Sequence, residues 1–304
     1  MKTVVIVGGS GFVGQHIVRR LAKKGHKIII PYQTSTNEAK LRLLGSLGQI
    51  IPLYFKDLQD SIITEALKES EIIINLKTLW DEKKITFDKG IYKFNTNLAD
   101  ILNRNDAKKN KMFIFFSGLG VDAESLSKRI RIIANTEEYL KRKLNNLSII
   151  RPGIIIGGGD LFLKRILPIF RFSFFVPLFG DGKAKLQPVF IDDVAKAVET
   201  IVTKNFLNNN IFELAGPEIF TYKSLYTHLK KCLQLTRVFV PIPFNLMSFF
   251  VSIIEKMPIN LITSDQLCLF KSDNFEQNID KSFKDLGFFP QDIREIIRIY
   301  LNKN

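Results

Sequence analysis

The sequence predicts an α/β fold, in which a doubly wound parallel sheet is joined to a smaller, mainly helical C-terminal lobe. Apolar runs alternate with helical patterns through the first half of the chain, as in consecutive βαβ units. One run, Val4–Val7, leads directly into Gly8, Gly11 and Gly14 and then into an amphipathic helix. After residues 151–153 the pattern changes, because Phe and Pro become frequent.

Six apolar runs, rich in β-branched and aromatic residues, are typical of strands that are covered on both faces. They span Thr3–Val7, Lys27–Pro31, Ile50–Tyr54, Ile72–Leu76, Met112–Ser117 and Ser148–Ile155. The helical patterns between them span residues 13–24, 38–45, 60–69, 86–103 and 127–143. The polar segment at 104–111 predicts a solvated loop.

The change of pattern divides the predicted chain into two domains. Residues 1–156 form the sheet domain, and residues 157–304 form a C-terminal lobe for a substrate or a partner. Short apolar runs at Pro188–Ile191 and Ile211–Leu214 predict that part of 187–215 returns to the sheet. The chain from residue 221 onward is predicted to be mainly helical.

Composition narrows the classes of partner. Apolar residues make up 46% of the 304 residues, which indicates a globular chain. The formal charge of +14 favours an anionic partner, although a composition simply rich in Lys and Asn explains it equally. No dense basic run is interleaved with aromatic residues, so we expect no nucleic-acid partner.

Further absences in the sequence bear on metals and location. Cys232 and Cys268 have no metal-ligand spacing, so we expect no metal and a reducing compartment. No uncharged run of about 18 apolar residues occurs, so we expect no transmembrane segment. The first strand begins at Thr3 without a presequence, which predicts a bacterial protein located in the cytoplasm.

The spacing of Gly8, Gly11 and Gly14 between a strand and a helix predicts a dinucleotide site. Glycines let the backbone turn tightly and approach a pyrophosphate, and the helix N-terminus offers N–H groups to it. Residues 8–14 therefore include the expected cofactor contacts, with Ser10 in the turn and with Phe12 and Val13 packing the helix on the sheet. The alternative is a βα turn that binds no nucleotide.

The end of the second strand selects between NAD and NADP, because an acid there binds the ribose 2′-OH and an Arg accommodates a 2′-phosphate. Residues 31–35 include neither, and Gln33 stands at the expected position. Lys40 and Arg42 lie a little further along the chain. The sequence therefore predicts a site that admits NAD or NADP.

Three further strand ends supply candidate cofactor contacts. Asp57 is expected either to accept a hydrogen bond from adenine or to cap the next helix. The backbone of Asn75, Leu76 and Lys77 is expected to pass under the cofactor, or to be an ordinary strand end. Ser117 is a candidate both for a cofactor contact and for the hydroxyl of a catalytic site, with a capped strand end as the alternative.

Five stretches together resemble one family. They are GGSGFVG at 8–14, LRLLGSLGQI at 41–50, RPGIIIG at 151–157, QPVFIDDVAKAV at 187–198 and FELAGPEIFTYKSL at 212–225. They are similar to atypical extended short-chain dehydrogenases/reductases of the NAD-dependent epimerase/dehydratase superfamily. The type member is the 39 kDa NAD(P)H-binding accessory subunit of respiratory complex I, which has bacterial relatives. The resemblance extends from Val4 to about Leu301 and implies a Rossmann-type fold.

The same resemblance bears on cofactor choice. The stretch PYQ at 31–33 is similar to the family's P-Y-R, whose Arg holds the NADPH phosphate. Gln33 stands at the position of that Arg, so the resemblance implies a weak preference for NADPH over NADH.

Active members of the family carry a Tyr and a Lys four residues apart on the helix after the fifth strand. The family's spacing from residues 151–152 places Arg129 and Ile133 at these positions, so the catalytic residues stay unknown. A literal Tyr-x-x-x-Lys, Tyr139 to Lys143, lies about 15 Å further along the helix. We expect this second pair not to be catalytic.

Other polar residues have simple structural explanations. Helix capping accounts for one of Asp192 and Asp193. His16, His26 and His228 have no spacing that suggests a metal or a triad.

A mixed basic and aromatic section follows the change of pattern. Lys164, Arg165 and Arg171, together with Phe244–Ile254, are consistent with contact to a membrane surface or a partner protein. Lining of the cleft in the second domain is the interpretation that we favour.

We therefore expect an NAD(P)(H)-binding protein with a structural, assembly or redox-sensing role and with weak or no dehydrogenase chemistry. The resemblance implies a dinucleotide as ligand and respiratory complex I, or a membrane-surface assembly, as partner. A location on the inner face of the cytoplasmic membrane would fit both. The alternatives are an active oxidoreductase on a quinone or isoprenoid-type substrate and a sugar-nucleotide epimerase or dehydratase.

Overall fold

A computed structural model describes residues 1–304 except 105–110, 207–208, 256–262, 278–279 and 303–304. Most of the loop predicted at 104–111 lies outside the described residues. Among these residues, seven strands form one sheet in the order β11-β6-β5-β4-β1-β2-β3, and every neighbouring pair is parallel. The strands are β1 (Thr3–Val7), β2 (Lys27–Tyr32), β3 (Ile50–Tyr54), β4 (Ile72–Asn75), β5 (Met112–Phe116), β6 (Leu147–Pro152) and β11 (Asn210–Leu214).

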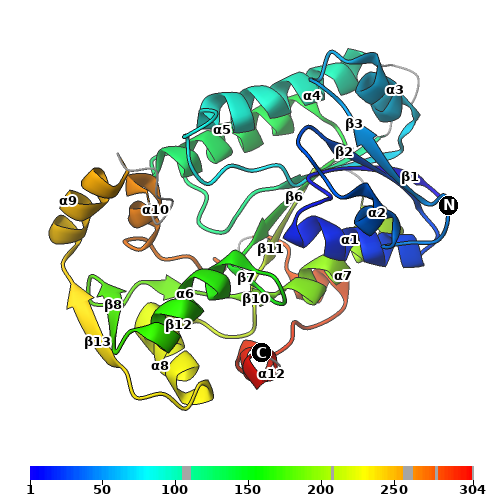
Figure 1. The fold of residues 1–304 in the computed structure, drawn as a ribbon. Helices are drawn as coiled ribbons and strands as arrows, with labels where there is room; N and C mark the ends of the chain where they lie inside the picture. The colour runs from blue at the N-terminus through cyan, green and yellow to red at the C-terminus, as the bar shows by residue number, and fades with distance from the viewer. Residues whose placement is uncertain (105–110, 207–208, 256–262, 278–279, 303–304) are drawn as a thin grey trace.

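Helices cover both faces of this sheet, so the predicted doubly wound α/β fold is confirmed (Figure 1). One face carries α1 (Phe12–Lys23), α2 (Glu38–Arg42), α7 (Ile191–Lys204) and α11 (Phe283–Leu286). The other face carries α3 (Ser61–Glu69), α4 (Phe94–Arg104) and α5 (Lys128–Lys143). The helix predicted over 86–103 is a π-helical turn, η1 (Asp88–Lys93), followed by α4. The strands are apolar on both sides because each side packs against helices.

The strand predicted at Ser148–Ile155 is wrong in its second part. β6 ends at Pro152, and the next short strand, β7 (Ile155–Ile156), pairs outside the main sheet with β10 (Val189–Phe190). A Cβ at Gly153 would lie 2.1 Å from the carbonyl oxygen of Gln187, so the backbone there passes directly against another segment. After Pro152 the chain thus leaves the main sheet, and β7 pairs with β10 instead.

The C-terminal lobe has its own apolar core. It contains α6 (Leu161–Phe172), β8 (Phe175–Phe179), α8 (Tyr222–Cys232), β13 (Val238–Ile242), α9 (Phe244–Ile254), α10 (Ser264–Leu269) and α12 (Ile293–Asn302), with the short strands β9 (Lys185–Leu186) and β12 (Phe220–Thr221). Strand β11 comes from the second half of the chain but pairs with β6 in the main sheet. The domain boundary between residues 156 and 157 stays a prediction.

None of the described helices has both the length and the apolar character needed to cross a bilayer.

Candidate functional site

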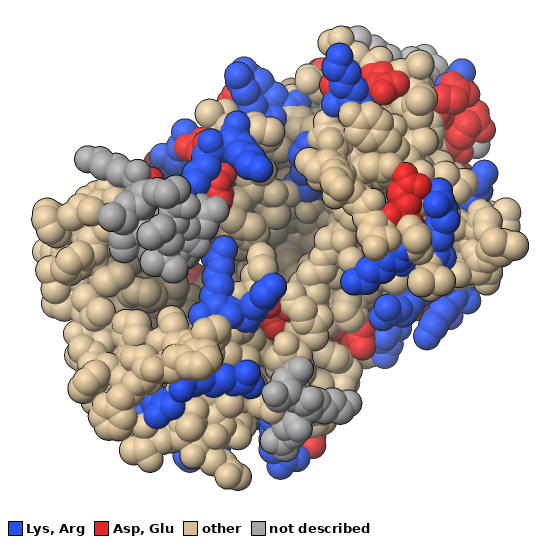
Figure 2. All heavy atoms as spheres, viewed as in Figure 1, with Lys and Arg blue, Asp and Glu red and all other residues tan. Residues whose placement is uncertain are grey.

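The carboxyl edge of the sheet has a switch point between β1 and β4. From β1 the sheet continues to β2 and β3 on one side and to β4, β5, β6 and β11 on the other. Open α/β sheets bind ligands in the crevice that this reversal creates. Figure 2 shows a hollow at the middle of this face, with Lys and Arg side chains around it.

The three glycines form a tight turn between β1 and α1. Gly8 has a φ of +80°, which L side chains rarely adopt, and the amide of Gly11 donates to the Gly8 carbonyl at 3.1 Å. A Cβ at Gly14 would lie 2.5 Å from the Gly8 oxygen and from the Gly9 Cα, so only glycine lets the helix approach the turn this closely.

The N-terminus of α1 is open toward the crevice. Gly11 is the exposed N-cap residue of α1 and has no side chain that could cap the helix. The first turn of α1 contains no acid. Val13 packs against the core, and the Phe12 ring lies edge-on to His16 at 5.6 Å. The Ser10 carbonyl accepts from Gln15 Nε2 at 2.7 Å. The amides at the start of α1 are therefore available to an anion.

At the end of β2, Gln33 joins two neighbouring segments. Its Nε2 donates to the Lys56 carbonyl at 2.9 Å, and its Oε1 accepts from Lys77 Nζ at 2.8 Å. Lys40 and Arg42 lie on α2, and Arg42 pairs with Glu38 at 2.8 Å.

The side chain of Lys77 is a site candidate that the sequence did not indicate. It follows β4, and its Nζ lies 3.9 Å from the centre of the Phe94 ring. Burial lowers its pKa from the ordinary value. The only sequence signal is its position directly after a candidate strand end.

Asn75 ends β4, and Leu76 follows it beside the glycine turn. Asn75 is fully buried, and its Nδ2 donates to Asn95 Oδ1 at 2.6 Å while its Oδ1 accepts from the Lys77 amide at 3.0 Å. Leu76 lies against the glycine turn, because a Cβ at Gly8 would be 3.2 Å from the Leu76 Cβ.

Asp57 is exposed just beyond β3, and its Oδ1 accepts from the Gln59 amide at 2.8 Å. The cap of α3 is Asp60, which accepts from the Ile62 amide at 3.1 Å. The helix-cap alternative for Asp57 is therefore wrong, and its contact with adenine stays a prediction.

Ser117 follows β5 and belongs to a buried ionic network. Its hydroxyl donates to Glu137 Oε1 at 2.5 Å, and Glu137 pairs with Arg151 at 2.7 Å. Arg151 also contacts Glu213 at 3.7 Å and Asp280 at 3.1 Å. The Ser117 hydroxyl is thus committed to a structural carboxylate.

Arg129 is buried at the start of α5 and holds the segment that follows β4. Its Nε donates to the Leu79 carbonyl at 2.7 Å, its Nη2 donates to Thr78 Oγ1 at 3.0 Å, and its guanidinium lies 4.1 Å from the centre of the Trp80 ring. Burial lowers the pKa of Arg129 to about 10. Ile133, one turn further along, is 3% exposed within the apolar core.

Tyr139 and Lys143 lie in the C-terminal half of α5. The Tyr139 hydroxyl donates to Asp100 on α4 at 2.9 Å, and its ring meets Tyr92 edge-on at 6.0 Å. Lys143 Nζ lies 5.7 Å from the Tyr139 ring centre. Tyr139 therefore faces η1 and α4, not the carboxyl edge of the sheet.

Helix capping does not explain Asp192 or Asp193. The residue flanking α7 is Phe190, without a side-chain cap, while Asp192 pairs with His16 at 2.9 Å and Asp193 accepts from the Gln291 amide at 2.8 Å. Both acids lie in the first turn, where the helix dipole favours negative charge.

The three histidines lie apart. His26 accepts from the Lys2 amide at 3.3 Å, and His228 contacts the Arg294 carbonyl at 3.1 Å. Among the described residues no group of three or more His, Cys, Asp or Glu side chains could hold a metal ion.

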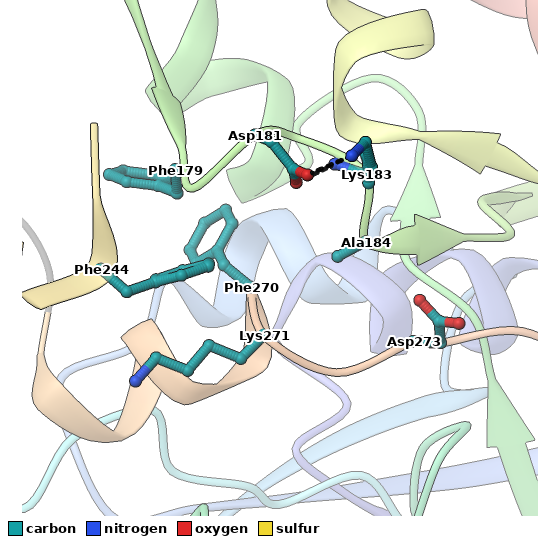
Figure 3. Close-up of a pocket in the computed structure, with 8 residues that line it drawn as sticks. All are labelled: Phe179, Asp181, Lys183, Ala184, Phe244, Phe270, Lys271 and Asp273. Carbon is teal, nitrogen blue, oxygen red and sulfur yellow. Dashed lines mark hydrogen bonds and ion pairs between the residues drawn. The ribbon is translucent and has the colours of Figure 1, made fainter. Parts of the chain in front are cut away.

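The C-terminal lobe has a pocket of about 460 Å³ between β8, the start of α9 and the end of α10 (Figure 3). Phe179, Phe244 and Phe270 line its apolar side, and Asp181 pairs with Lys183 at 2.8 Å. Phe244, from the predicted section Phe244–Ile254, lines this pocket, whereas Lys164, Arg165 and Arg171 are exposed on α6 and are not among its lining residues. Their contact with a cleft of the second domain stays a prediction.

Comparisons with known proteins agree with this fold. Residues 4–121 match the NAD dependent epimerase/dehydratase family. The chain is 26% identical over 301 residues to NADH dehydrogenase (ubiquinone) 1 alpha subcomplex subunit 9 of Arabidopsis thaliana, covering 95% of this chain and 74% of that protein. It is 25% identical to the NADH-ubiquinone oxidoreductase 40 kDa subunit of Neurospora crassa, over 98% of this chain and 78% of that protein.

A similar solved structure is that of a human epimerase family protein with NADPH, with a TM-score of 0.68, 15% identity and coverage of 99% and 100% of the two chains. The resemblance predicted from the motifs is confirmed: the chain is similar to epimerase/dehydratase-type short-chain dehydrogenases and, over nearly its whole length, to accessory subunits of complex I.

Proposed function

We propose that this chain binds NAD(P)(H) at the β1–α1 turn and serves as a structural, assembly or redox-sensing component, with weak or no dehydrogenase chemistry. One observation carries the proposal: an uncapped glycine turn at the switch point lies on the same sheet edge as an α5 that offers Arg129 and Ile133. The glycine turn and the start of α1 support cofactor binding. Arg129 and Ile133 stand where an active member would carry its proton-transferring Tyr and Lys.

The residues of the crevice fit a dinucleotide. The close approach of Gly14 to Gly8 and the open amides of α1 suit a pyrophosphate. Gln33 would lie at the ribose, Asp57 at the adenine, and the backbone of Leu76 beneath the cofactor. When bound, the cofactor would supply hydride transfer at its nicotinamide ring.

The residues around the expected catalytic centre make structural contacts. Arg129 stays protonated near neutral pH and is engaged by the 78–80 segment, so it is a poor general acid. Ile133 lies in the core and cannot grip a ribose, and the Ser117 hydroxyl is directed at Glu137. These contacts disfavour an active oxidoreductase and, more strongly, an epimerase or dehydratase.

The partner that we propose is a membrane-surface assembly related to respiratory complex I. Relatives of this chain are complex I subunits, and the C-terminal lobe exposes apolar side chains without being able to span a bilayer with any described helix. The exposed side chains include Phe172, Phe174, Phe175, Leu246, Phe249, Phe250 and Ile253. Residues 161–190 and 216–255 of this lobe contain nine Lys and Arg against three Asp and Glu. Apolar surface with nearby positive charge suits an anionic membrane face. The bacterial and cytoplasmic location stays a prediction.

Calorimetric titration with NADPH and NADH tests the proposed site. Gly11→Asp would place a carboxylate at the pyrophosphate position and should abolish binding of both cofactors. Thr203→Asp is the matched control, because it adds the same charge at an exposed position near the far end of α7 and should bind like the wild type. Equal binding by the wild type and Gly11→Asp, or no binding by the wild type, would contradict the proposal.

The same samples test for chemistry. With a quinone analogue as acceptor, cofactor oxidation should stay far below the turnover of about 1 per second or more that is typical of enzymes. Turnover in the ordinary range would favour the active oxidoreductase instead.

A further inference from the structure

The amine of Lys77 lies at the end of β2, although Lys77 itself follows β4. Strand β1 separates these two strands, so the side chain reaches across the end of β1, above the glycine turn. Two contacts define this path. A Cβ at Gly8 would lie 3.3 Å from the Lys77 amide nitrogen, and Lys77 Nζ donates to Gln33 Oε1 at 2.8 Å.

This amine is a cation without an anion. It contacts the Gln33 amide oxygen and the face of the Phe94 ring, and no carboxylate among the described residues pairs with it. Burial lowers the pKa of Lys77, and no neighbouring acid opposes that effect. A partly buried positive charge of this kind gains most from a ligand that brings negative charge.

Glu38, an acid shortly after the end of β2, is already engaged. Glu38 accepts from the Tyr32 hydroxyl and pairs with Arg42, and the Tyr32 hydrogen bond lowers the pKa of Glu38. Its charge is therefore offset by Arg42, and it is held by Tyr32 at the end of β2. An ionised acid that was free at this place would instead favour the ribose 2′-OH of NAD.

We infer that Lys77 binds the 2′-phosphate of an NADP-type dinucleotide, with Gln33 as the positioning residue that holds its amine at the end of β2. This inference rests on the proposed dinucleotide site. The end of the second strand is where a 2′-phosphate is accommodated. A Lys ammonium binds phosphate there as a point charge. The chain is then selective for NADPH, a stronger preference than Gln33 alone implies.

The adenosine half of the cofactor isolates this contact. Affinities for 2′,5′-ADP and 5′-AMP, and for NADPH and NADH, are measured by calorimetry on the wild type, Lys77→Met and Lys77→Arg. Lys40→Met is the matched control, because Lys40 is a cation on α2, shortly after the end of β2. Lys77→Met should weaken 2′,5′-ADP and NADPH by about tenfold or more and leave 5′-AMP and NADH unchanged. Lys77→Arg and Lys40→Met should keep the phosphate preference.

Three results would overturn the inference. An unchanged ratio of 2′,5′-ADP to 5′-AMP affinity in Lys77→Met would show that another group holds the phosphate. Tighter binding of all four ligands by Lys77→Met would show that the Lys77 side chain obstructs the site and does not bind the phosphate. In both cases the dinucleotide site itself stands. Failure of NADH and NADPH to bind the wild type removes the proposed function, and this inference with it.

Discussion

At the level of single residues, the first two turns of α5 determine which chemistry the crevice can support. The Arg129 guanidinium is satisfied by a carbonyl, a hydroxyl and an indole ring of the segment after β4, so it fastens that segment to α5. Its pKa of about 10 leaves it charged at neutral pH. Ile133 extends the apolar core to the position where a Lys would otherwise project. The same helix positions thus serve packing and loop attachment.

His26 provides a residue-scale prediction about pH. It is nearly buried before β2, where burial lowers its pKa below 6.5, and its Nδ1 accepts from the Lys2 amide. Because the folded-state pKa lies below the unfolded value, the unfolded chain binds the proton more readily. Stability is therefore present above the unfolded pKa of about 6.5 and is lost as pH falls through the folded pKa.

Urea denaturation at about pH 7.5 and about pH 5 measures this effect. The free energy of unfolding should fall more in the wild type than in His26→Gln, which cannot titrate. Equal losses in both proteins would show that His26 does not contribute to acid sensitivity.

At the level of elements, the main strands could be predicted because their cause is local. Each is a continuous apolar run bounded by polar or glycine residues, and β1, β3 and the start of β5 fall where the sequence indicates. The strand–glycine–helix order likewise located the turn of the candidate site.

Other features depend on contacts between distant segments and could not be foreseen. β6 stops at Pro152, where the backbone of Gly153 passes directly against Gln187, a contact that no local pattern encodes. Asn75 is a polar strand end that turns toward Asn95 in the core. Lys77 reaches Gln33 only because β4 and β2 flank β1, so its role depends on the strand order.

Helix α9 provides an element-scale prediction about the apolar surface. Phe249 is 62% exposed on it, so Phe249→Ser should leave the free energy of unfolding within about 0.5 kcal/mol of the wild type. If this surface meets a membrane, the same change loses about 1–2 kcal/mol of apolar burial, or about five- to thirtyfold in affinity. Sedimentation with vesicles containing an anionic phospholipid measures this membrane affinity.

Phe289→Ser is the control, because Phe289 is 75% exposed outside this surface. It should bind vesicles like the wild type. Equal weakening by both variants would indicate unspecific hydrophobic adsorption, and unchanged binding by Phe249→Ser would place the contact elsewhere.

At the level of the whole molecule, the crevice lies where the sheet domain faces the C-terminal lobe. Asn274, from the second half of the chain, contacts the loop that follows β5, since its Nδ2 donates to the Leu119 carbonyl at 2.7 Å. A dinucleotide bound at the sheet edge would stabilise the folded state by its binding free energy, about 2.7 kcal/mol at a concentration of about 100 times Kd.

Amide hydrogen exchange with and without NADPH tests the location of the cofactor most directly. We predict slower exchange across residues 8–15 and 75–79 when NADPH is present, because these backbones line the turn and the end of β4. The amides of Tyr139–Lys143 should exchange at the same rate in both samples. Protection of Tyr139–Lys143 with no change across residues 8–15 would contradict the proposed site and favour a working Tyr-Lys pair.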